Sequence, residues 1–236
     1  MLYSKVTCKG YSPSHVAEVG VWHPINSNIS RFIDEGIKTT LVEPDPESIQ
    51  LIKKQLDGKN VFLHEVAACD FNGKVDLYQR KESSFVCSLP GSPAIINDDY
   101  EVSTTDRFTA DAQIFSEIDD GTIDLISIDI EGSEWFVIKH MVSRPAIISI
   151  ETHGGMYTNP YIHELEEWMQ SNSYTLWYKD RSDSVFVLSN IIHVGLTDKI
   201  RLYVSNLLIK FRSTKRHLIK YIKTLVKVRS KYTNIA

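Results

Sequence analysis

One stretch of the chain, IDLISIDIEGSEWFVIKHMVSRPAIISIETHG at residues 123–154, constrains the fold more than any other. Two β-branched runs, residues 123–128 and 146–150, predict buried strands, and residues 133–142 between them have the apolar spacing of a helix. A strand, a helix and a strand within about 30 residues form a right-handed βαβ unit with parallel strands. The stretch therefore predicts an open α/β sheet.

Both predicted strands end in polar side chains. Asp129 and Glu131 follow the first strand, and Glu151 and His153 follow the second. Open α/β sheets build their sites at the carboxyl ends of neighbouring strands, so these four side chains are expected to converge. Asp129 and Glu151 suit a shared hard cation such as Mg²⁺ or Mn²⁺, with His153 as a third ligand. Either Glu131 or His153 suits the role of a general base.

A structural role for the same segment is the alternative. In a D-x-E-G turn the side chain of Glu131 or Ser133 can cap the helix that follows. Glu134 would then stabilise the first helical turn through the helix dipole.

The rest of the chain continues the alternation of strands and helices. Strands are expected over residues 15–21, 37–43 and 60–68, and helices over residues 31–36 and 47–56. The remaining expected elements, in chain order, are a half-exposed strand at KVDLY, a loop over 83–99, an edge strand over 102–108, helices near 110–118 and over 160–169, and an antiparallel hairpin around the turn at 181–183. This order predicts a doubly wound, mostly parallel sheet with a reversed last strand.

Charge divides the chain near Asp198. Residues 199–236 hold eleven Lys and Arg and no acid, whereas residues 1–198 hold 15 basic and 30 acidic side chains. We therefore expect a body over residues 1–198 and a basic, amphipathic helical tail over residues 199–236. The tail suits an anionic membrane surface, and the alternative is an apolar stripe docked on the acidic body or on a second subunit in an oligomer. No base-stacking motif accompanies it, so no specific nucleic-acid partner is predicted.

The sequence predicts a cytoplasmic protein that is peripheral on the membrane. The first fifteen residues lack the apolar segment of a signal peptide, and no window approaches the roughly 20 apolar residues of a membrane span. Cys8, Cys69 and Cys87 are scattered and odd in number, which favours free thiols in a reducing compartment.

The first two predicted strands also end in acids. Glu18 and Gly20 close the first strand and Glu43 closes the second, where a carboxylate commonly accepts both hydroxyls of a ribose. Residues 21–24 do not continue into G-x-G-x-x-G, so NAD is poorly supported, and no P-loop motif exists. The structural alternative is that both acids lie on a solvated rim.

Five segments together resemble the FkbM family of S-adenosylmethionine-dependent O-methyltransferases: AEVGVWHP, TLVEPDPESIQLIKKQL, NVFLHEVAACDFNGKVDLY, VSTTDRF and IDLISIDIEGSEWFVIKHM. The resemblance covers residues 16–150 and is most specific at IDIEGSEWFVIK, which is similar to the family's I-D-V-E-G-x-E-x-x-V-L-K. It implies a class I methyltransferase sheet with S-adenosylmethionine as cofactor. The implied cofactor contacts run from the methionine end through the ribose to the adenine: Glu18, Gly20, Glu43, Asp129, Glu65, Val66 and Ala67.

The acceptor implied by the resemblance is a hydroxyl of a sugar, in a glycan or a lipid-linked glycan. Related metal-dependent sugar O-methyltransferases bind their ion with acids that Asp129 and Glu151 resemble. The chain departs from the family's usual acid-x-Gly-Ala-Asn-x-Gly loop, because Trp22 and His23 stand where small residues are usual. Two other functions remain open: a glycosyltransferase that holds a metal–sugar nucleotide with the D-x-E at residues 129–131, and a non-catalytic adaptor that keeps the fold.

Overall fold

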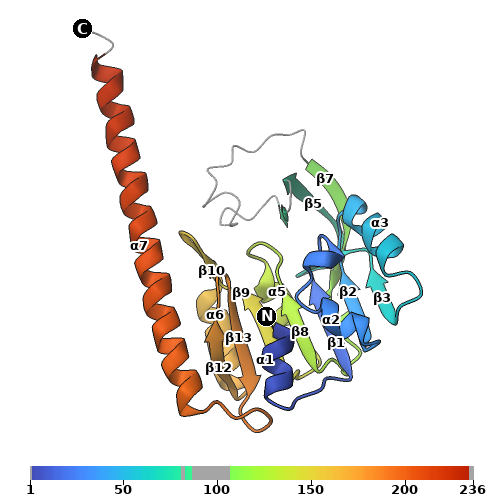
Figure 1. Cartoon of the computed structure of the whole chain (residues 1–236). Coiled ribbons are helices and arrows are strands. Elements are labelled where there is room, and N and C mark those ends of the chain that lie inside the picture. The colour runs from blue at the N-terminus through green and yellow to red at the C-terminus, as the bar shows by residue number, and fades with distance from the viewer. Residues whose placement is uncertain (1, 81–82, 87–106, 234–236) are drawn as a thin grey trace.

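The computed structural model describes residues 2–80, 83–86 and 107–233, with a seven-stranded sheet at its centre (Figure 1). The strands lie side by side in the order β12-β13-β9-β8-β1-β2-β3. Their bounds in chain order are β1 His15–Val19, β2 Lys38–Val42, β3 Val61–His64, β8 Leu125–Ile128, β9 Ile147–Glu151, β12 Tyr174–Lys179 and β13 Asp183–Leu188.

This sheet is parallel except at one end. β3, β2, β1, β8 and β9 pair in parallel, whereas β13 is antiparallel to both of its neighbours, β9 and β12. β13 is the last strand of the described chain and is inserted between β9 and β12. The predicted doubly wound, mostly parallel sheet with a reversed last strand is therefore confirmed, and the βαβ unit of residues 123–154 lies at its centre.

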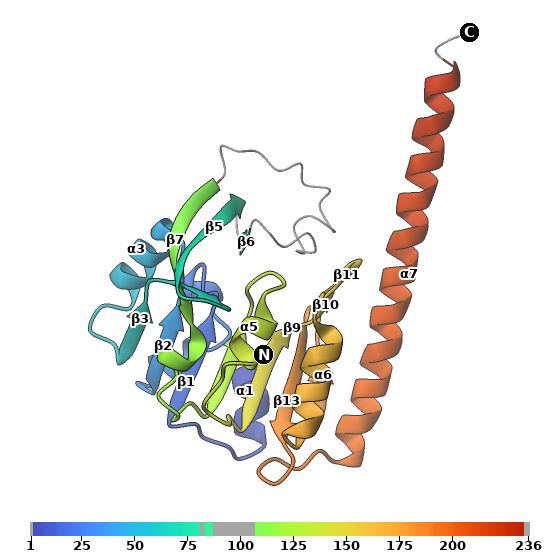
Figure 2. The ribbon, with the colours of Figure 1, turned by 180° about the vertical axis from the view of Figure 1, so that it is seen from behind.

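Helices cover both faces of the sheet. α1 and α2 lie on the face toward the viewer in Figure 1, and α6 lies on the opposite face, which Figure 2 shows. The helix bounds are α1 Leu2–Cys8, α2 Ser30–Asp34, α3 Pro46–Gln55, α5 Glu134–Ile138, α6 Ile162–Ser171 and α7 Leu196–Thr233. Among the described residues, no helix combines the length and apolar content needed to cross a bilayer.

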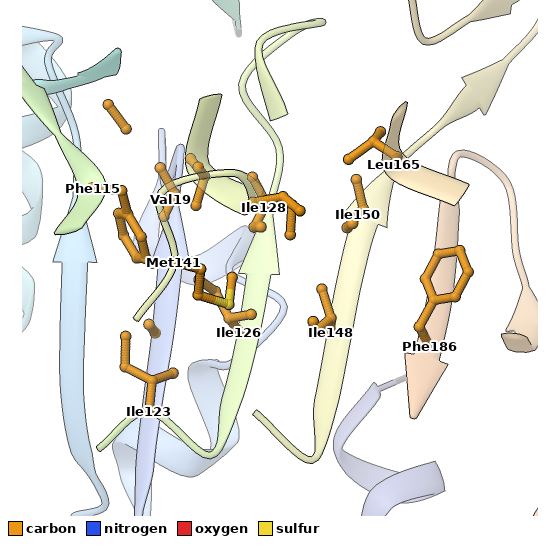
Figure 3. Packing of buried hydrophobic residues seen from close by; sticks show 14 of the residues in the cluster. Val19, Phe115, Ile123, Ile126, Ile128, Met141, Ile148, Ile150, Leu165 and Phe186 are labelled. Carbon is orange, nitrogen blue, oxygen red and sulfur yellow. The ribbon is translucent and has the colours of Figure 1, made fainter. Parts of the chain in front are cut away.

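Burial on both faces explains why the central strands are apolar at almost every position. Ile126 and Ile148 pack in the cluster under α5 and α6, together with Leu165 (Figure 3). Their chain neighbours Leu125 and Ile147 point the other way, into the cluster under α1 and α2. Because side chains alternate along a strand, a run that is apolar throughout supplies both layers at once.

A second, four-stranded sheet corrects three sequence expectations. Its order is β4-β7-β5-β6, with bounds β4 Ala67–Cys69, β5 Gly73–Arg80, β6 Ser83–Val86 and β7 Arg107–Ile114. The single strand expected over residues 60–68 is divided between β3 and β4, which belong to different sheets. The loop expected over residues 83–99 begins with strand β6, and its remainder lies outside the described residues.

The helix expected near residues 110–118 was also wrong. Residues up to Ile114 continue β7, which pairs with β4 on one side and β5 on the other, and only Phe115–Glu117 form a short 3₁₀ turn. In RFTADAQI apolar and polar residues alternate, so the strand buries one face while the alanines' helix preference is overridden by two hydrogen-bonded ladders. Residues 102–106 of the expected edge strand lie outside the described residues.

Smaller differences concern element ends and thiols. α5 covers five residues of the expected 133–142, and α1 forms where the sequence carried little signal. α3 begins as expected, with Pro46 in its first turn and the Asp45 carboxylate accepting a hydrogen bond from the Ser48 amide. Cys8 and Cys69 are free thiols, and Cys87 lies outside the described residues.

Candidate active site

A cavity of about 300 Å³ opens at the carboxyl ends of β1, β2 and β8. Most of the side chains predicted to contact a cofactor line it. The predicted residues in its wall are Glu18, Gly20, Glu43, Val66, Ala67, Asp129 and Glu131. Glu65 is the exception: it is exposed and forms an ion pair with Lys53, with 2.5 Å between Nζ and Oε1.

At the base of the cavity, the loop that follows β1 and the loop that follows β8 are in direct contact. The Gly20 amide donates to the Val42 carbonyl at 3.0 Å, and the Asp129 amide donates to the Val19 carbonyl at 2.9 Å. Gly20 has φ +81°, and a Cβ at this position would lie 1.9 Å from the Asp129 carbonyl oxygen. Only glycine allows this approach, so one glycine is retained where the family loop usually has two.

Glu43 holds the loop that contains Trp22. Its Oε2 accepts hydrogen bonds from the amides of Val21 and Trp22, both at 2.8 Å, and its Oε1 accepts one from the Asp45 amide at 2.9 Å. Burial raises the pKa of Glu43, and the three amide donors oppose that shift by stabilising the charged form. The carboxylate thus replaces glycines in shaping a loop in which Trp22 has φ +48°.

Glu18 has one oxygen whose hydrogen-bonding capacity is unused. The residue is 3% exposed, its Oε1 accepts from the Asn28 amide at 2.9 Å, and its Oε2 has no hydrogen-bond partner among the described residues. Burial raises the pKa of Glu18 to about 7. A buried carboxylate oxygen in a cavity wall calls for a donor or a cation from a bound molecule.

Three carboxylates meet beside the cavity. One oxygen each of Asp129, Glu134 and Glu151 can be chosen so that all lie within 4.8 Å of one another. Within the described part of the chain, none of the three forms an ion pair. Asp129 is the most solvent-exposed of the three residues, but protein atoms are packed closely around its carboxylate. Its surroundings and the neighbouring Glu131 carboxylate raise its pKa, and burial together with Asp129 raises that of Glu151.

Sequence reasoning missed the part of Glu134 in this cluster. Its Oε1 accepts from the amides of Ile130 at 3.0 Å and Gly132 at 3.1 Å, and its Oε2 accepts from the side-chain amide of Asn159. Burial raises the pKa of Glu134 to about 7. Glu134 thus shapes the turn that carries Glu131, and the third acid of the family string IDVEGxE was the signal that marked it.

Ser133 and Tyr157 face the same region with unused hydroxyls. Ser133 precedes α5, but its side chain makes no capping hydrogen bond, contrary to the structural alternative that gave it this role. Both residues are buried, and neither hydroxyl has a hydrogen-bond partner among the described residues. Burial raises the pKa of Tyr157, and the Glu134 and Glu151 carboxylates raise it further.

The structure does not bring His153 into the acid cluster. Its Nε2 lies 3.2 Å from the Asp180 carbonyl oxygen, and its Nδ1 lies 2.9 Å from the Thr152 hydroxyl. The Thr152 hydroxyl in turn lies 2.6 Å from that of Ser184. Both ring nitrogens are therefore engaged against β13 and the turn before it, and burial lowers the pKa of His153.

A doubly wound sheet with a reversed last strand, and an acid-lined cavity at the carboxyl ends of its first strands, define a class I methyltransferase fold. The model of the Methyltransferase FkbM domain family matches residues 14–176. The chain belongs to the FkbM family and is an S-adenosylmethionine-dependent methyltransferase. No curated protein sequence matches it.

Several solved methyltransferase structures are similar to the chain at low identity. The ribosomal protein L11 methylase from Lactobacillus delbrueckii subsp. bulgaricus is 13% identical, with a TM-score of 0.45 over 79% of this chain and 76% of that one. The methyltransferase domain of bacterial CtHen1-CN is 10% identical, with a TM-score of 0.44 over 79% and 97%. Precorrin-6y C5,15-methyltransferase from Geobacter metallireducens GS-15 is 13% identical, with a TM-score of 0.38 over 78% and 85%.

Proposed function

We propose that the protein transfers a methyl group from S-adenosylmethionine to a hydroxyl of a sugar, in a glycan or a lipid-linked glycan. The observation that carries the proposal is the contact between the cavity and the acid cluster through Asp129, which belongs to both. The proposed cofactor site therefore lies next to a group of carboxylates that can accept a proton.

The side chains in the cavity wall fit the cofactor. Bound S-adenosylmethionine supplies an electrophilic methyl group together with an ammonium and two ribose hydroxyls. The unsatisfied Oε2 of Glu18 suits the ammonium or a hydroxyl. A carboxylate has about four acceptor positions, and the backbone uses three of those of Glu43, so room is left for about one ribose hydroxyl rather than the expected two. Val66 and Ala67 offer the apolar wall expected beside the adenine.

Glu131 is the proposed general base. A sugar hydroxyl has a pKa far above 7, so its proton must be taken up as the methyl group is transferred. Glu131 lines the cavity on a turn where its φ is +56°, a conformation that Glu134 supports by accepting hydrogen bonds from the flanking amides of Ile130 and Gly132. His153 was the other candidate, but both of its ring nitrogens are engaged elsewhere.

A divalent cation is part of the proposal. Three carboxylates within 4.8 Å suit a hard ion such as Mg²⁺ or Mn²⁺, which prefers oxygen ligands. Asp129 and Glu151 keep their expected roles as ligands, while Glu134 takes the position that the sequence assigned to His153. When bound, the ion would lower the pKa of an acceptor hydroxyl. The Tyr157 hydroxyl beside Glu134 and Glu151 can donate to a ligand oxygen or to the acceptor.

Calorimetry with S-adenosylhomocysteine tests the cofactor half of the proposal. We expect binding at sub-millimolar concentration, and Glu43→Gln to weaken it about tenfold or more, since one of the carboxylate's amide-accepting oxygens is lost. Glu47→Gln, an exposed change on the adjacent α3, is the matched control. No binding by the wild-type protein would refute the proposed use of this cavity for S-adenosylmethionine, and binding of a nucleotide sugar in its place would favour a glycosyltransferase.

Methyl transfer to candidate acceptors tests the other half. The full chain is incubated with methyl-labelled S-adenosylmethionine and a panel of mono- and oligosaccharides, and label in the sugar is measured. Label on a sugar hydroxyl is expected. Label confined to peptide or nucleic-acid acceptors in a parallel panel would refute the sugar assignment and leave the methyltransferase class intact.

A further inference from the structure

Helix α7 attaches to the body by one narrow line of side chains. It starts beside the end of the sheet, next to β12, and its carboxyl-terminal part projects beyond the body in both views (Figures 1 and 2). Lys9 pairs with Asp198 at its base, with 2.7 Å between Nζ and Oδ2. The half-buried residues along its first part recur every three or four positions: Leu202, Ser205, Ile209 and Ser213.

A broader apolar stripe runs along a different side of α7. At 100° per residue its members fall on one half of the helix, roughly opposite the line that contacts the body. Each is exposed by 43% or more of its surface. The members are Ile200, Tyr203, Val204, Leu207, Leu208, Phe211, Leu218 and Ile219. The apolar stripe is therefore not the surface with which α7 docks on its own body, which was one sequence-based alternative.

Basic side chains border this apolar stripe. Arg201 and Arg212 follow one edge and Lys199 and Lys210 follow the other, while Lys215 lies within the stripe; all five are exposed. Residues 199–236 contain eleven Lys and Arg and no acid, while residues 1–198 have a net charge of −15. The cationic, apolar surface thus belongs to α7, a helix that extends away from an anionic body.

We propose that α7 binds the surface of an anionic phospholipid bilayer, with its apolar stripe in the interface and its flanking basic side chains at the lipid phosphates. Amphipathic helices with this division lie in the plane of the membrane. The charge pattern opposes the alternative of two copies joined stripe to stripe, because each helix brings eleven basic groups and a single acid, Asp198, which already pairs with Lys9. Lipid binding by α7 does not depend on the methyl-transfer proposal, so either can fail alone.

Vesicle co-sedimentation of the full-length protein tests the proposal. The vesicles are phosphatidylcholine with about a quarter phosphatidylglycerol, compared with phosphatidylcholine alone. Leu207→Asp with Phe211→Asp disrupts the centre of the stripe. Asn206→Asp with His217→Asp is the control, since it adds the same charge at exposed positions of the same helix outside the stripe.

The expected result is pelleting that requires the anionic lipid and weakens in high salt. The stripe variant should partition about tenfold less than the control variant, because two apolar side chains no longer enter the interface. Equal pelleting of the two variants, or pelleting that ignores lipid charge, would overturn the proposal. A stripe-dependent dimer in analytical ultracentrifugation without lipid binding would assign the stripe to a second copy instead.

Discussion

Gly20 and the backbone carbonyl of Asp129 are in contact, so tightly that a Cβ on Gly20 would lie 1.9 Å from the carbonyl oxygen. Gly20 directly follows β1, and Asp129 directly follows the neighbouring strand β8. Their contact therefore lies where the cavity and the acid cluster meet. The two parts of the proposed site therefore share one backbone junction.

Gly20→Ala is expected to destabilise the protein by about 3 kcal/mol or more and to abolish S-adenosylhomocysteine binding, because steric overlap adds to the unfavourable φ. Gly36→Ala is the matched comparison: Gly36 has φ +78°, nearly the same, but nothing lies within 4 Å of its Cβ position. That variant should lose only about 1 kcal/mol, from the backbone alone. Chemical denaturation measures both, and equal losses would show that the contact with Asp129 is unimportant.

The buried Glu18 should make stability depend on pH. Its pKa is raised from 4.5 to about 7 on folding, so between these values the folded protein holds a proton that the unfolded chain has released. Wild-type stability should therefore fall as pH rises through this window, by up to about 3 kcal/mol relative to Glu18→Gln.

Denaturation of both proteins at pH 5 and pH 8 measures this difference. Glu18→Gln is close in shape and keeps an acceptor for the Asn28 amide, so packing should be little changed. The advantage of the variant over wild type should be larger at pH 8 than at pH 5. The same advantage at both values would mean that Glu18 does not bind a proton on folding.

Divalent cations should stabilise the protein through the acid cluster. Mn²⁺ at about 100 times its dissociation constant should add about 2.7 kcal/mol and raise the melting temperature by several degrees. Asp129→Asn and Glu151→Gln should each remove most of this ion-induced increase, whereas Asp57→Asn, at an exposed position, should retain it. Differential scanning fluorimetry with and without the ion decides, and an increase that survives in both cluster variants would place the ion elsewhere.

Catalysis should also depend on the same ion. We expect EDTA to abolish methyl transfer and added Mg²⁺ or Mn²⁺ to restore it, because the metal lowers the pKa of the acceptor hydroxyl. Full activity in the chelator would leave proton removal to the side chains alone.

The kcat values of Glu131→Gln and His153→Gln should show which of the two residues is the general base. Glu131→Gln removes the proposed base and should lower kcat by about a hundredfold or more. His153→Gln, which alters a side chain held by Thr152 and Asp180, should lower kcat by less than about tenfold. Both variants should bind S-adenosylhomocysteine as wild type does, and a larger loss from His153→Gln would reassign the base.

The sheet was largely predictable because its causes are local. The runs ending at Ile128 and Ile150 are apolar except for Ser127 and Ser149, and such runs form strands buried on both faces. Residues 107–114 were harder, because the two alanines of RFTADAQI favour a helix and only pairing with β4 and β5 selects a strand there. The division of residues 60–68 was likewise invisible, since both parts are equally apolar and differ only in the sheet that each joins.

The site was predictable at strand ends and not beyond them. Asp129 and Glu43 end parallel strands, so their convergence follows from the topology. Glu134 and His153 lie past the ends of their strands, where the direction of a side chain is set by hydrogen bonds to distant residues. Asn159 holds the first and Asp180 the second, and sequence separation carries no information about either contact.

The sequence by itself determined the strands of the central sheet, the acids at the carboxyl edge and the charge division near Asp198, because periodicity, strand ends and composition are properties of adjacent residues. Only the tertiary structure decided which acids meet, how Glu43 serves the loop of Trp22, and which side of α7 packs on the body. All three outcomes depend on contacts between segments that are far apart in the chain. Packing and desolvation set these contacts, and no pattern among neighbouring residues encodes them.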